Sequence, residues 1–124
     1  KEIRMTTLRL VYGANQSQRE QAIKTQINPT LFTMALLEGG AVGNAALDSL
    51  ATIKVVRMAP GCPCCSGNLT MRVMLNRALK EKPDLVFLSL ANPLHLTAIR
   101  DFLQEDQYCG RLNLGIDLDC GVTK

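Results

Sequence analysis

The fold is decided by residues 53–81, which read IKVVRMAPGCPCCSGNLTMRVMLNRALKE. The β-branched run Ile53–Met58 predicts a strand, and the spacing of apolar residues over Leu69–Glu81 predicts an amphipathic helix. The segment Pro60–Gly67 between them holds three of the five cysteines. Core packing gives no reason for such a cluster, because a buried cysteine behaves as a small apolar residue. Open α/β sheets bind ligands where a strand ends and a helix begins, so the cysteines indicate a ligand site.

The same alternation of strand and helix patterns extends along the rest of the chain. Four further strands are expected, at Thr6–Tyr12, Leu31–Leu37, Leu85–Leu90 and Leu112–Leu118. Three further helices are expected, one opening at Asn15–Ser17, one over residues 44–50 and one from Asn92. Five strands alternating with four helices predict a three-layer α/β fold, with a mostly parallel five-stranded sheet and helices on both faces. The length fits a single domain over residues 1–124.

Two local patterns add detail to this fold. Ser17 followed by Glu20 is a capping-box pattern, which predicts that the first helix is capped at Ser17. The strand Ile53–Met58 mixes polar with apolar residues, whereas Leu31–Leu37 is almost wholly apolar. We therefore expect Ile53–Met58 near an edge of the sheet and Leu31–Leu37 covered on both faces.

Composition and charge exclude several classes of function. The net charge is +3 and only 4% of the residues are aromatic, so the chain has no stacking platform for nucleic acid. The longest apolar runs are too short to cross a membrane. The chain opens without an export signal pattern, so we expect a cytoplasmic protein. In that reducing compartment, clustered cysteines indicate metal or redox chemistry more often than disulfides.

The cysteine cluster has a metal-binding interpretation and a redox one. Thiolates bind zinc in tetrahedral sets, and Cys62, Cys64 and Cys65 are the expected ligands of zinc or another transition metal. Glu38 and His95 are candidate additional ligands, as are Cys109, Cys120 and water, although a helix-start position is the simpler interpretation of His95. Alternatively, Cys62 and Cys65 form a Cys-x-x-Cys pair of a thiol-disulfide oxidoreductase. A loop that retains its cysteines without a ligand is the third interpretation.

Three stretches of the sequence resemble the N-terminal half of the CobW-type GTPases. Gly61–Cys65 (GCPCC) is similar to the family's Gly-Cys-x-Cys-Cys motif and is the most specific of the three. Met34–Gly43 (MALLEGGAVG) resembles its strand and Glu-Gly segment, with Glu38 at the glutamate. Lys82–Leu88 (KPDLVFL) resembles its Lys-Pro-Asp strand. The resemblance implies a P-loop-NTPase-like fold and metal handling through the cysteine motif. It covers about half of a family member, so a longer natural chain is one alternative.

The phosphate loop of that family is degenerate in this sequence. Where the family has G-x-x-G-x-G-K-T, residues Gly13–Glu20 read GANQSQRE. Gly13, Ser17 and Arg19 are the remaining candidates to contact a phosphate or another anion. Glu20 stands where a hydroxyl should bind magnesium, and we interpret it as a capping-box residue instead. The family's Glu-x-Ser-Gly has become residues 89–92, SLAN, and no Asn-Lys-x-Asp occurs, so GTP hydrolysis is not expected.

These observations predict a non-enzymatic, metallochaperone-like CobW-type domain with a degenerate nucleotide site. The expected partners are a metal ion and a client metalloprotein, with a homodimer as the alternative to a monomer. A surviving nucleotide-binding protein that uses Gly13, Ser17 and Arg19 is the second hypothesis. A thiol-disulfide oxidoreductase that uses Cys62 and Cys65 is the third.

Overall fold

The computed structural model describes residues 5–13, 15–38, 53–58, 67–90, 96–105, 108 and 111–121. Their elements, in chain order, are β1 (Thr6–Tyr12), α1 (Gln16–Thr25), β2 (Thr33–Glu38), β3 (Ile53–Met58), α2 (Gly67–Lys80), β4 (Leu85–Ser89), α3 (Leu96–Leu103), β5 (Leu112–Leu114) and β6 (Leu118–Asp119). The helix expected over residues 44–50 and the cap expected at Asn92 lie outside the described residues. Among the described residues, no helix has the length and hydrophobicity needed to cross a membrane.

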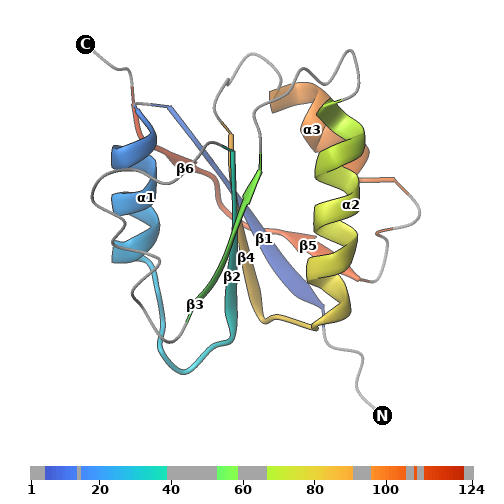
Figure 1. Ribbon diagram of the computed structural model, residues 1–124, viewed down its shortest axis with the longest axis horizontal. Coiled ribbons are helices and arrows are strands. Elements are labelled where there is room, and N and C mark those ends of the chain that lie inside the picture. The colour runs from blue at the N-terminus through green and yellow to red at the C-terminus, as the bar shows by residue number, and fades with distance from the viewer. Residues whose placement is uncertain are drawn as a thin grey trace.

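All strand pairs in the described sheet are parallel, as the sequence predicts. The order is β3-β2-β4-β1-β5, and β6 also pairs with β1. Helix α1 covers one face of the sheet, and α2 and α3 cover the other (Figure 1). Strand β3 stands at one end of this order, which confirms its expected position at an edge.

The described part of the sheet contains six strands, so the prediction of five is wrong. The expected strand Leu112–Leu118 is divided into β5 and β6, which pair with the first and last residues of β1. Side chains hold the residues between them: Arg9 Nε donates to the carbonyl oxygen of Ile116 at 2.7 Å, and Arg100 pairs with Asp117. Arginines on β1 and α3 therefore hold the stretch where the strand is interrupted.

The apolar runs of β2 and β4 are buried on both faces, as expected for central parallel strands. Alternate side chains point to opposite faces of a strand, and they divide the core in two. The core beneath α2 and α3 includes Leu8, Leu10, Met34, Leu36, Val86 and Leu88. The core beneath α1 includes Val11, Ile23, Ala35, Leu37 and Phe87. Strand β2 begins two residues later than predicted, because Leu31 N donates to the Asn28 carbonyl oxygen in a turn.

Helix α1 is capped at Asn15 and not at Ser17, so the predicted capping box is wrong. Asn15 Oδ1 accepts the amide of Gln18 at 2.8 Å, and Gln18 Oε1 accepts the amide of Asn15 at 3.2 Å. Asparagine and glutamine provide the same reciprocal bonds as the expected serine and glutamate, two positions earlier. Glu20 lies beyond the first turn of the helix, where it cannot serve as a cap.

In the turn after α2, the non-glycine residue Lys82 has a positive φ of 56°. A side chain in this left-handed region costs about 1–2 kcal/mol. We therefore expect Lys82→Gly to raise the free energy of unfolding by about 1 kcal/mol in urea denaturation. Arg77→Gly is the matched control, because Arg77 is an exposed residue within α2 and its replacement should lower stability by a similar amount. A loss of stability in Lys82→Gly would contradict this account.

Candidate functional site

The connections at the carboxyl ends of β1 and β4 diverge. These strands are neighbours, yet the chain leaves β1 through α1 towards β2 and leaves β4 through α3 towards β5. Strands β2 and β5 lie on opposite sides of the pair, and α1 and α3 lie on opposite faces (Figure 1). In open α/β sheets such a switch point opens a crevice that binds ligands. The switch point is therefore a candidate ligand site.

The side chain of Arg19 extends from α1 into this switch point. Arg19 is 5% exposed. Its Nη1 donates to the carbonyl oxygen of Gly13, directly after β1, at 3.2 Å, and its Nε donates to Ser89 Oγ, at the end of β4, at 3.1 Å. The guanidinium thus joins the carboxyl ends of the two diverging strands.

Three acidic side chains influence the Arg19 guanidinium. Burial lowers the pKa of the Arg19 guanidinium, whereas the charges of Cys120, Glu38 and Glu20 raise it. Glu38 is the last residue of β2 and is 9% exposed, and Cys120 is half-buried just after β6. Arginine keeps its proton at neutral pH in proteins. The guanidinium is therefore a buried cation among acidic groups.

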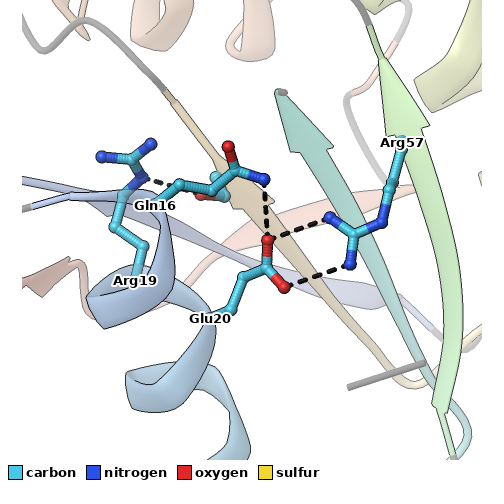
Figure 2. A network of polar contacts seen from close by, with 5 residues as sticks. Gln16, Arg19, Glu20 and Arg57 are labelled. Atoms are coloured by element: carbon cyan, nitrogen blue, oxygen red, sulfur yellow. Dashed lines mark hydrogen bonds and ion pairs between the residues drawn. The ribbon is translucent and has the colours of Figure 1, made fainter. Parts of the chain in front are cut away.

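Glu20, the next residue along α1, belongs to a separate polar network that reaches β3 (Figure 2). Both Glu20 carboxylate oxygens accept from Arg57, at 2.9 and 3.1 Å, and Gln16 Nε2 donates to the same carboxylate at 2.9 Å. The Glu20 side chain is 5% exposed and that of Arg57 is 17% exposed. The ion pair ties α1 to the edge strand, and this explains why Glu20 takes no part in capping the helix.

Gly13 is required by contacts within the protein. Its φ is +88°, and a Cβ atom placed there would lie 2.5 Å from the carbonyl oxygen of Gly121. Cys120 N also donates to the Tyr12 carbonyl oxygen at 2.8 Å. The segment that follows β6 therefore packs closely against the turn that follows β1.

The structure brings together some of the residues that the sequence singled out. Gly13 and Arg19 meet, whereas Ser17 is exposed on α1. Cys62, Cys64, Cys65, His95 and Cys109 lie outside the described residues. Within the described residues, no three His, Cys, Asp or Glu side chains gather as a metal site would require.

Glu38 and Cys120 are the candidate metal ligands that lie among the described residues, and Glu38 lies beside the strand that leads into the cysteine segment. In the register of β2 with β3, Glu38 is the partner of Met58. Cys62 comes four residues after Met58, and Cys65 comes two residues before the first residue of α2. Cys120 is a free thiol, and burial raises its pKa, with Arg19 acting in the opposite direction.

Sequence reasoning missed the partners Arg57 and Ser89. Arg57 precedes the cysteine segment at the end of an edge strand, where a half-buried arginine needs an acidic partner. Ser89 appeared only as a departure from a family motif. The sequence signal that could have indicated these partners was the pair Arg19-Glu20. These are two adjacent charged residues in the helix turn that follows a parallel strand, where side chains face the carboxyl edge of the sheet.

Comparisons with known proteins returned no match to models of protein families, to curated proteins or to solved structures.

Proposed function

We propose that this protein is a CobW-like, P-loop-like α/β domain that binds a transition metal through Cys62, Cys64 and Cys65 and passes it on as a metallochaperone. The observation that carries the proposal is the buried carboxylate of Glu38 at the carboxyl end of β2, in register with Met58. This pairing fixes a potential ligand beside the strand from which the cysteine segment departs. The proposed setting is the cytoplasm, where thiols stay reduced.

The chemistry of the donors suits a metal ion that is held and released. Thiolates favour zinc, copper(I), cobalt or nickel over hard cations such as magnesium. Cys65 precedes the first residue of α2 by two positions, and the positive end of a helix dipole favours a thiolate there. Glu38 or His95 would complete the coordination, and an incomplete set would leave a position open for transfer to a client metalloprotein.

The described contacts favour metal handling over nucleotide handling. A phosphate loop needs glycines and free backbone amides around the phosphates, and a lysine that reaches them. Here the amides of Asn15 and Gln18 already donate within the start of α1. The Arg19 side chain donates to Gly13 and Ser89, and Glu20 is paired with Arg57. Among the described residues, these contacts occupy groups that a phosphate would need, which supports the cysteine segment as the source of the proposed ligands.

Titration of the reduced protein with cobalt(II) tests this proposal. We expect a sulfur-to-cobalt charge-transfer band that saturates at one equivalent and disappears on addition of excess zinc. Cys62→Ser should weaken the affinity at least about tenfold, because loss of even an outer-shell partner of a metal site costs that much. Cys120→Ser is the matched control and should leave the titration unchanged. Absence of the band, with every thiol still reactive, would refute the proposal.

Two alternatives are decided by separate measurements. A fluorescent GTP analogue that binds at micromolar concentration, with loss of binding in Ser17→Ala, would favour a nucleotide-binding protein. A Cys62–Cys65 disulfide with a potential near the cytosolic glutathione range would favour a thiol oxidoreductase. Sedimentation with and without zinc tells a homodimer from a monomer.

A further inference from the structure

Two described groups that contact the Arg19 guanidinium at the switch point are hydrogen-bond acceptors. The carbonyl oxygen of Gly13 and the hydroxyl oxygen of Ser89 face the guanidinium of Arg19. Glu38, which is 9% exposed, contributes negative charge, whereas the carboxylate of Glu20 is paired with Arg57. A carbonyl oxygen and carboxylates stabilise a cation and repel a phosphate. These described groups therefore favour a cation over an anion at the position of the Arg19 guanidinium.

At the start of α1, the capping box occupies two backbone amides that could otherwise favour an anion. An anion-binding helix N-terminus presents unsatisfied amides. Asn15 and Gln18 instead satisfy each other's amides, at 3.2 and 2.8 Å. The capping box that stabilises the helix thus removes donors that a phosphate would need.

We propose that the crevice between the carboxyl ends of β1 and β4 is a cation-binding site, which the Arg19 guanidinium fills as an internal ligand and from which phosphate groups are excluded. When Arg19 is removed, the site takes a small planar organic cation of the guanidinium class. This inference does not depend on the metal-binding function, because it involves neither the cysteine segment nor its ligands.

Chemical rescue of Arg19→Ala by methylguanidinium tests the first part. The variant should melt below the wild type. Methylguanidinium chloride at about ten times its Kd should raise the Tm of the variant by about 3–6 °C relative to the same concentration of sodium chloride. The wild type should show no such rise, because its site is filled. Arg9→Ala is the control: the Arg9 side chain also donates to a carbonyl oxygen, that of Ile116, but in a solvent-exposed contact, so no rescue is expected.

Tripolyphosphate tests the second part. It should leave the Tm of the wild type and of Arg19→Met unchanged, because methionine fills the crevice without supplying a positive charge. If Arg19→Ala does not fold in buffer, recovery of its circular dichroism spectrum in methylguanidinium supports the proposal and failure to recover contradicts it. A folded Arg19→Ala that ignores methylguanidinium, or stabilisation of the wild type or Arg19→Met by tripolyphosphate, would overturn it.

Discussion

Arg57→Met is expected to lower the free energy of unfolding by about 3–5 kcal/mol, because it leaves the Glu20 carboxylate buried without its guanidinium. Glu20→Leu should cost less, since the Arg57 side chain is 17% exposed and water can solvate part of it. The double variant Glu20→Leu/Arg57→Met should cost less than either single change or be close to neutral, because no buried charge is then left unbalanced. Urea denaturation of the four proteins gives the comparison.

The control for this cycle is the second ion pair that ties β3 to a neighbouring element. Lys54 Nζ lies 2.7 Å from Glu81 Oε2, and the two side chains are 53% and 40% exposed. An exposed pair contributes about 0–1 kcal/mol, so Lys54→Met should cost no more than that. Equal losses for Arg57→Met and Lys54→Met would show that the burial of the Glu20 pair has no energetic consequence.

Gly13→Ala is expected to lower the free energy of unfolding by about 3 kcal/mol, the second-largest effect we anticipate. The new Cβ would lie 2.5 Å from the carbonyl oxygen of Gly121 and 3.0 Å from its nitrogen, both of which are backbone atoms. The positive φ adds about 1–2 kcal/mol of local strain to the cost of moving that backbone. Thermal and urea unfolding of the purified variant measure the loss.

Gly121→Ala separates the two contributions. Gly121 has the same φ of +88°, but a Cβ placed there would meet no atom within 4 Å. Its replacement should therefore cost only the local strain, about 1–2 kcal/mol. Similar losses for the two variants would mean that the close contact between the turns after β1 and β6 is relieved without cost.

The arrangement of the sheet could be predicted because it follows from burial along the chain. Continuous apolar runs such as Leu85–Ser89 have no polar face to expose, so they become central parallel strands. The strand Ile53–Met58 mixes polar with apolar residues and therefore has a polar face to expose. It stands at the end of the order of described strands. These properties belong to each segment by itself, and no distant partner is needed to read them.

The details that were missed depend on partners far away in the sequence. The last strand is interrupted where Arg9 and Arg100, more than ten residues distant, contact Ile116 and Asp117. Glu20 has the spacing of a capping residue from Ser17, but its position is explained by Arg57 on another element. A local sequence pattern cannot distinguish a capping role of Glu20 from an ion pair with Arg57. Either a backbone amide or a guanidinium satisfies the carboxylate.

At the candidate site, the partners of Arg19 likewise could not be predicted from the local sequence. In the sequence it stands where a phosphate-binding lysine would be, so an anion was the natural expectation. Its observed partners are a backbone carbonyl oxygen and a serine hydroxyl, 6 and 70 positions away in the chain. Only the tertiary fold brings these acceptors to the guanidinium.

X-ray absorption at the zinc edge, on reduced protein carrying one equivalent of zinc, tests the central claim most directly. If Cys62, Cys64 and Cys65 share the ion, the first coordination shell will contain two or three sulfur atoms at about 2.3 Å, and Cys62→Ser will remove one of them. A shell made only of oxygen and nitrogen at about 2.0–2.2 Å, or a shell unchanged by that substitution, would contradict the claim.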